Sequence, residues 1–167
     1  MKKQKGFSLI ELLIVVAIIL IIAAIAIPNL MRSRMAANEA SAVGSLRTIN
    51  TAQVTYSTTY GTGFAQLPAL GGADPCTAAA ATSCLLDSVL SGGTKSGYTI
   101  TVPVPAAPGT TALPNVVYEA GGQPVAAGQS GQRSFCSDQS GVIRANPAGG
   151  APPANCAGAA AFLPLNN

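Results

Sequence analysis

The sequence of 167 residues predicts an α+β protein, with a long N-terminal helix packed on a small antiparallel sheet in a loop-rich head. Three observations predict this fold. An unbroken apolar run occupies residues 7–27, and a helical pattern of period 3.6 follows it. Short alternating segments separated by Gly and Pro, typical of strands and turns, fill the remainder.

The apolar run, FSLIELLIVVAIILIIAAIAI, has 21 residues and one ionisable side chain, Glu11. As a helix it would measure about 31 Å, which matches the ~30 Å hydrocarbon core of a bilayer. It is longer than the apolar region of a cleaved signal peptide, about 7–15 residues. We therefore expect a single transmembrane helix that stays with the mature chain.

Basic residues flank this run unevenly. Lys2, Lys3 and Lys5 precede it, whereas Arg32 and Arg34 follow it. Because positive charge favours the cytoplasmic side, we expect the N-terminus in the cytoplasm. The rest of the chain then lies in an oxidising compartment, where its four cysteines can form disulfides.

The composition argues against two classes of function. The chain has no His, which removes imidazole-dependent catalysis and His-ligated zinc, so we do not expect an enzyme. From residue 7 onward six basic residues balance six acidic ones. No basic surface for nucleic acid is therefore expected.

The helical pattern continues beyond the apolar run. Apolar residues recur at steps of 7, 4, 3 and 7, at Met35, Ala42, Leu46, Ile49 and Tyr56. We expect one helix of about 50 residues, ~75 Å long. Pro28 lacks an amide hydrogen and should kink it, although a proline can also simply be tolerated within a membrane helix.

The region after Tyr60 is rich in Gly and Pro and low in charge. We expect a short helix at Ser83–Leu90 and strands at 97–102 and 115–120. Residues 133–137 should pair with 142–145 across a turn at 138–141. Three or four antiparallel strands would then pack on the apolar face of the long helix.

The start of the apolar run carries the most specific motif. Lys5, Gly6 and Phe7 end a short basic leader, and Glu11 lies at the fifth position after Gly6. With Pro28, this pattern over residues 2–30 resembles the type IV prepilins, a family that includes the pseudopilins of type II secretion. The resemblance implies cleavage by a prepilin peptidase between Gly6 and Phe7, and methylation of the new amine of Phe7.

Glu11 needs a physical reason, because an unpaired carboxylate in an apolar environment costs several kcal/mol. After cleavage, a neighbouring subunit displaced by about one helical turn would bring its Phe7 amine to Glu11. The pair would fix the assembly register, as the resemblance also implies. Alternatively, Glu11 lies close enough to the membrane boundary to reach the headgroups by itself.

Four cysteines allow three pairings, and their spacing favours Cys76 with Cys84 and Cys136 with Cys156. The second loop would resemble the C-terminal disulfide loop of many pilins. The gaps do not match zinc-site spacing, so no metal or other cofactor is expected.

The resemblance implies a division into leader (1–6), transmembrane and polymerisation segment (7–30), amphipathic helix (31–58) and disulfide-bonded head (59–167). The implied partners are further copies of the chain, the peptidase and methyltransferase, the assembly platform and its ATPase. The chain would be a single-pass precursor in the bacterial inner membrane and then part of an extracellular pilus or periplasmic pseudopilus.

Three functions are compatible with these patterns. The first is a structural subunit of a type IV pilus, a surface filament for adhesion, twitching motility or DNA uptake. The second is a type II secretion pseudopilin or a minor pilin. In the family that this chain resembles, the main pseudopilin has an acidic calcium site near its C-terminus. The last 30 residues here contain only one acidic residue, Asp138, which argues against such a calcium site in this chain. The third is a lone membrane-anchored periplasmic domain.

Overall fold

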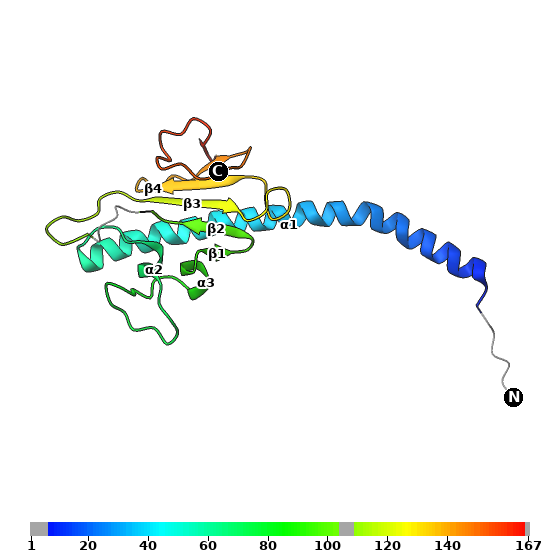
Figure 1. Cartoon of the computed structure of the whole chain (residues 1–167), viewed down its shortest axis with the longest axis horizontal. Coiled ribbons are helices and arrows are strands. Elements are labelled where there is room, and N and C mark those ends of the chain that lie inside the picture. The colour runs from blue at the N-terminus through cyan, green and yellow to red at the C-terminus, as the bar shows by residue number, and fades with distance from the viewer. Residues whose placement is uncertain (1–6, 104–108, 166–167) are drawn as a thin grey trace. The chain divides into compact units, whose positions relative to one another are not determined.

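The computed structural model describes residues 7–103 and 109–165. The chain divides into two compact units, Met1–Arg34 and Met35–Asn167. The fold is α+β and pilin-like, as the sequence predicts. A long helix, α1 (Leu9–Tyr60), packs through its second half against a six-stranded antiparallel sheet (Figure 1).

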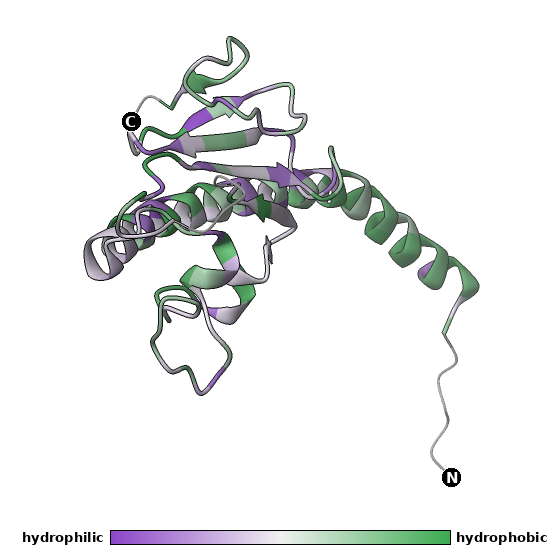
Figure 2. Cartoon of the chain, turned by 60° about the vertical axis from the view of Figure 1, so that its left-hand side comes forward, coloured by the Kyte–Doolittle hydropathy of each residue, from purple (hydrophilic) through white to green (hydrophobic). Residues whose placement is uncertain are grey.

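The first unit is the apolar part of α1. The assigned helix continues through Pro28 without a break. Its large side chains are exposed, including Ile10, Leu13 and Leu20. This stretch is long and apolar enough to cross a membrane, and the described residues leave it uncovered. Figure 2 shows the change from this apolar part to the mixed second half of the helix.

The second half of α1 forms one side of the head core. Ala42, Leu46, Ile49 and Tyr56 from the predicted apolar stripe are buried, and Met35 is only partly buried. The four buried residues pack with Tyr98, Ile100, Phe135 and other apolar side chains of the head in one cluster, which does not include Met35. The helical period in the sequence therefore identified the packed face correctly.

The sheet has the strand order β1-β2-β3-β4-β5-β6, with every neighbouring pair antiparallel. The strands are β1 (Thr94–Lys95), β2 (Tyr98–Thr101), β3 (Glu119–Pro124), β4 (Ser134–Asp138), β5 (Arg144–Asn146) and β6 (Leu163–Pro164). The predicted turn at 138–141 joins β4 to β5, with Gly141 N–H donating to the Asp138 carbonyl at 2.8 Å. Both edge strands, β1 and β6, have only two residues, so few unpaired backbone N–H and C=O groups are available at the sheet edges to pair with another chain.

The predicted strand at 115–120 is displaced in the structure, because β3 begins at Glu119. Asn115 instead pairs with the segment after α1, where its carbonyl accepts from Phe64 N–H at 2.8 Å. β3 contains two glycines, which weakened its strand pattern in the sequence. The structure requires Gly121, because a Cβ there would overlap Pro152.

The predicted helix at Ser83–Leu90 is also largely wrong. The helix is α3 (Ser88–Ser91), and Asp87 caps it by accepting the Leu90 N–H at 2.7 Å. The preceding residues bond instead to α2 (Leu67–Leu70), a short helix that was not predicted from the sequence. Leu85 and Leu86 both donate their N–H groups to the Leu70 carbonyl at 2.9 Å.

Two of the buried polar side chains of α1, Gln53 and Glu39, hold the helix to the head. Gln53 donates to the Ala65 carbonyl at 2.6 Å and accepts from Ala65 N–H at 2.9 Å. Glu39 accepts from the backbone N–H groups of Gln132 and Arg133 at 2.8 and 3.0 Å, and from Arg133 Nε at 2.7 Å. Burial alone would raise the pKa of Glu39, but these hydrogen bonds and the guanidinium charge lower it.

We predict that Glu39→Gln lowers the stability of the head at pH 7 by about 1–2 kcal/mol, since it removes the charge from a carboxylate that accepts three hydrogen bonds. Because the pKa of Glu39 is lower in the folded head than in the unfolded chain, the ionised carboxylate stabilises the folded head at any pH above the ordinary Glu pKa. This stabilisation is lost as the pH falls through the folded-state pKa. Thermal unfolding of the full chain in detergent, at pH 7 and pH 3, measures both effects.

The exposed Lys95–Asp87 pair provides the matched control. Lys95→Gln should change stability by less than about 0.5 kcal/mol, because exposed ion pairs contribute little. Equal losses in the two variants, or a Glu39→Gln effect that grows on acidification, would contradict the assigned role of Glu39.

Candidate functional site

The start of α1 is the first candidate site. Ser8 directly precedes the helix, and Glu11 accepts the Ser8 backbone N–H through Oε2 at 3.0 Å. A Ser at the N-cap and a Glu three residues later form the sequence pattern of a capping box. The carboxylate thus satisfies one of the free amide groups at the positive end of its own helix. This role was not predicted from the sequence, although the Ser-x-x-Glu spacing that signals it is present there.

The predicted processing positions lie next to this cap. Gly6 lies outside the described residues, and Phe7 is exposed just before α1 begins. Along a helix, Phe7 and Glu11 are separated by four residues, about 6 Å. The site therefore combines an exposed apolar surface, a carboxylate at its N-terminal end and a potential new amine beside that carboxylate.

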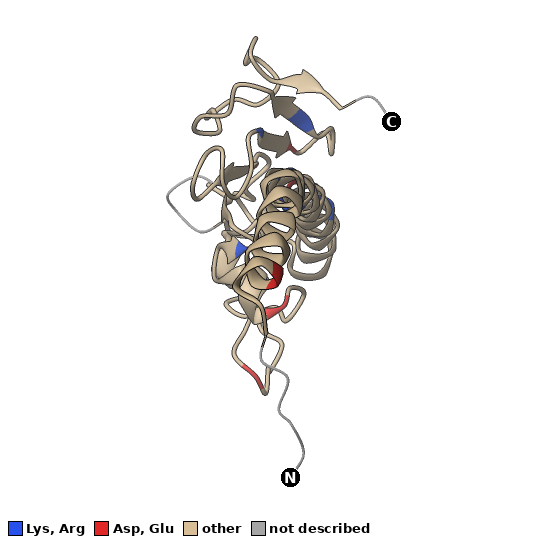
Figure 3. Ribbon diagram, turned by 90° about the vertical axis from the view of Figure 1, so that its right-hand side faces the viewer, with Lys and Arg blue, Asp and Glu red and all other residues tan. Residues whose placement is uncertain are grey.

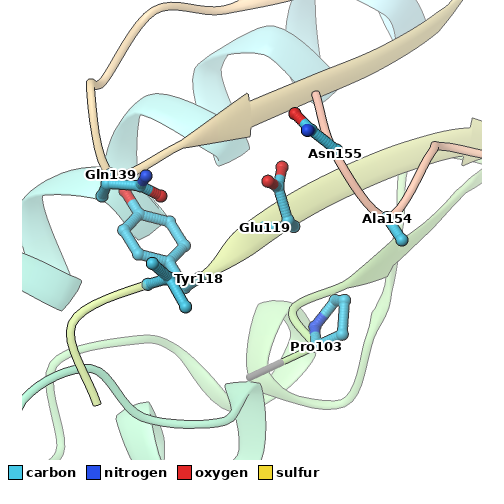
Figure 4. Close-up of a pocket in the computed structure, with 7 residues that line it drawn as sticks. Pro103, Tyr118, Glu119, Gln139, Ala154 and Asn155 are labelled. Carbon is cyan, nitrogen blue, oxygen red and sulfur yellow. The ribbon is translucent and has the colours of Figure 1, made fainter. Parts of the chain in front are cut away.

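The second candidate site is a surface recess of about 430 Å³ on the head. Figure 4 shows Tyr118, Glu119, Gln139 and Asn155 around it. Tyr118 donates its hydroxyl to Asn50 of α1 at 2.9 Å, and burial, with the nearby carboxylates, raises the pKa of Tyr118 to about 12. The Tyr118 hydroxyl thus links the sheet to the helix and is not available as an acid at neutral pH.

Glu119 lies opposite Asp138 in the pairing of β3 with β4. Its Oε2 accepts the Cys156 N–H at 3.1 Å and so holds the C-terminal loop. Burial raises the pKa of Glu119; the Cys156 hydrogen bond opposes this effect, and the Asp138 carboxylate adds to it. Asp138 itself accepts from Ser140 and from Arg144 Nη1, the latter at 3.4 Å.

Glu119, Asp138 and Cys156 come close enough together to be considered as metal ligands. The Cys156 sulfur, however, is part of a disulfide and cannot act as a thiolate ligand. Both carboxylates already accept hydrogen bonds within the head. We therefore interpret this cluster as the attachment point of the C-terminal loop.

The structure joins Cys76 to Cys84 and Cys136 to Cys156, the pairing that the spacing favours. The second bridge connects β4 to the loop before β6, and both of its cysteines are buried. It packs with Phe162 in a small apolar cluster of its own. This bridge gives the proline- and alanine-rich C-terminal segment a fixed attachment to the sheet.

Comparison with known proteins bears on the N-terminal site. Residues 1–27 match the family described as the prokaryotic N-terminal methylation motif. The chain carries the methylation motif of the type IV pilin family. Such pilins are typically structural proteins without enzymatic activity.

Two relatives extend this finding beyond the motif. The chain is 62% identical over 39 residues to the type IV wide pilus major component PilA4 of Thermus thermophilus, covering 23% of this chain and 30% of that protein. It is 46% identical over 54 residues to the type IV major pilin protein PilA of Myxococcus xanthus, covering 32% of this chain and 24% of that protein. The chain thus aligns with about a third or less of either pilin's length. No solved structure matches it significantly.

We predict that Glu119→Gln stabilises the pilin-like head by about 0.5–1 kcal/mol at pH 7, because the amide avoids the partial burial of a charge, removes repulsion from Asp138 and keeps an acceptor for Cys156 N–H. The raised pKa of Glu119 means that its ionisation costs stability as the pH rises through that pKa. The gain should therefore vanish near pH 4. Thermal unfolding of the two proteins across this range measures it.

Asp138→Asn is the matched control on the opposing strand. It weakens the contacts of Asp138 with Ser140 and Arg144, so we expect a loss of about 1–3 kcal/mol. A destabilised Glu119→Gln variant at pH 7 would contradict the proposed repulsion between the two carboxylates.

Proposed function

We propose that this chain is a structural subunit of a type IV pilus, made as a single-pass inner-membrane precursor and processed by a prepilin peptidase and methyltransferase. Its leader is residues 1–6, and cleavage between Gly6 and Phe7 leaves a methylated Phe7. The assembly platform and its ATPase then transfer the subunit from the membrane into a helical homopolymer outside the cell.

One observation carries this proposal: the methylation motif, residues 1–27, includes an apolar helical surface that the described chain leaves uncovered. The hydrophobic effect requires a cover for this surface, either lipid or apolar side chains of other copies. A membrane precursor and a filament core supply these two covers in succession. Two relatives whose names identify them as a major pilus component and a major pilin support the filament.

Glu11 has a defined part in this assembly. One of its oxygens, Oε2, accepts the Ser8 N–H, and among the described residues no hydrogen bond engages Oε1. In a filament core, a cationic Phe7 amine from a neighbouring copy would compensate the remaining charge. Axial displacement by about one helical turn would align the two groups.

The proposed processing predicts the mature chain. Removing Met1–Gly6 from the 167 residues leaves 161, beginning at N-methylated Phe7. Intact-mass analysis and N-terminal sequencing of protein from cells measure this directly. A mature species that retains the leader in cells with an active peptidase would overturn the prepilin assignment.

The proposed role of Glu11 predicts that Glu11→Gln abolishes filaments while leaving the subunit intact. The amide retains an acceptor for Ser8 N–H, so α1 should start as before, and only the charge is lost. We expect correctly cleaved, oxidised subunits in the inner membrane and at least tenfold less protein in the sheared surface fraction. Immunoblots of the two fractions measure the distribution.

Glu11→Asp is the control because it keeps the charge on a shorter side chain, and it should retain part of the surface fraction. Normal filament yield from Glu11→Gln would favour a carboxylate that only reaches the headgroups. Wild-type filaments confined to the periplasm would instead identify a pseudopilin and overturn the surface pilus.

A further inference from the structure

The charged residues of the head are almost all used within it. In the described part of residues 35–167, three ion pairs form, Glu39–Arg133, Asp87–Lys95 and Asp138–Arg144. Glu119 is half-buried and holds Cys156 N–H. Among these described residues the remaining charged side chains are Arg47 and Asp74, both exposed and without an ion pair. The head thus presents one unpaired cation and one unpaired anion.

Arg47 lies on the outward side of α1, near the strands that end the chain. It lines a recess of about 250 Å³ together with Gly141, Val142, Ile143 and Leu165. The first three of these residues connect β4 to β5, and Leu165 follows β6. Arg47 therefore marks the edge of the head formed by β5 and β6.

Asp74 lies at the other edge. It belongs to an exposed loop, residues 73–82, which follows α2 and leads toward α3. α2 contacts α3, and α3 contacts β1, the first strand of the sheet. Figure 1 shows this loop extending from the head on the side of α2 and α3, away from the C-terminal strands, and the end-on view of Figure 3 shows the C-terminal strands on the opposite side of the helix from this loop.

The loop is held in place although its residues are exposed. Cys76 and Cys84 close it with a disulfide. The Tyr56 hydroxyl donates to the Ala80 carbonyl at 2.7 Å and ties the loop to the end of α1. A surface that is already ordered loses less conformational entropy when it binds a partner.

We infer that the loop at 73–82 of one subunit docks on the outward face of α1 in a second copy, with Asp74 pairing with Arg47 of that copy. The two charges are opposite in sign and lie at opposite edges of the sheet. A contact between different surfaces of identical chains is heterologous, so it propagates from copy to copy. The inference rests on the proposed polymerisation and specifies one contact within it.

The surfaces around the two charges both consist of small exposed side chains. The loop contributes the exposed small side chains of Ala78–Ala81. The helix contributes Gly44, Thr48 and Thr51, and both threonine hydroxyls donate to carbonyls of their own helix at 3.1 Å. Their methyl groups are therefore free to contact a partner. Small side chains on both surfaces permit a close approach, while the charge pair determines which regions meet.

Charge reversal tests this contact in the full chain. Asp74→Arg and Arg47→Asp should each lower the sheared filament fraction at least fivefold, because each places like charges together at every contact. Combining both substitutions in one chain restores an opposite pair, and filaments should return to within twofold of wild type. Co-expressing the two single variants should also restore filaments, since unlike subunits can alternate.

Arg34→Asp is the matched control: combined with Asp74→Arg, it should restore nothing. Each variant must first show normal cleavage and both disulfides by mass mapping. Wild-type filament yield from Asp74→Arg, or a double variant no better than the worse single variant, would overturn the contact. Rescue by Arg34→Asp in place of Arg47→Asp would overturn the assignment to Arg47.

A photo-cross-linking amino acid at position 51, one turn from Arg47 on the exposed face of α1, leaves Arg47 in place and separates this contact from the proposed pilus function. In an otherwise wild-type chain it should capture a second copy through a peptide cross-linked within residues 73–82, in whichever fraction the polymer is found. Capture in the periplasm without surface filaments would support the contact and overturn the surface pilus. Surface filaments without capture of that peptide would overturn the contact and leave the pilus function standing.

Discussion

The uncovered apolar half of α1 is the constraint on which the biology of this chain depends. A helix that is apolar on every face is stable in lipid or inside a packed bundle, and water disfavours it elsewhere. The described chain supplies no cover for residues such as Ile10, Leu13 and Leu20. Other molecules must therefore cover these side chains, which in the proposed pilus are first lipid and then further copies of the chain.

The second half of the same helix is covered on one face by the chain itself, because it forms part of the core of a small head with few aromatic residues. Its buried stripe includes Glu39, Ala42, Leu46, Ile49, Gln53 and Tyr56 at alternating steps of three and four, with the buried Ser45 and Ala52 beside it. The apolar members contribute the core, while Glu39 and Gln53 bond to backbone groups of the head. Buried polar groups stabilise a fold only when their partners are in place, so these two fix the register between helix and head.

The head also limits its surface charge. Most of its charged side chains form ion pairs within the chain, and two disulfides secure the loops that carry little apolar area. Such a surface has few features by which a partner could distinguish one region from another. An isolated pair of charges, Arg47 and Asp74, can then have a large influence on how copies associate.

The sequence by itself determined the features that depend on local periodicity or on a linear motif. These include the long helix, its apolar and amphipathic halves, the methylation motif around Gly6 and Phe7, and the turn between β4 and β5. Cysteine spacing also favoured the pairing that the structure shows. Each of these depends on residues near one another in the chain, so their physical cause is visible in a short window.

The tertiary structure decided the features that depend on distant residues. β3 forms at Glu119–Pro124, despite two glycines, because neighbouring strands bond to it and Pro152 occupies the space of a Cβ at Gly121. The predicted helix at Ser83–Leu90 shortened because Leu85 and Leu86 bond to Leu70. The roles of Glu39, Gln53 and Glu119 were hidden for the same reason: a buried polar residue depends on a partner that only the folded chain brings near.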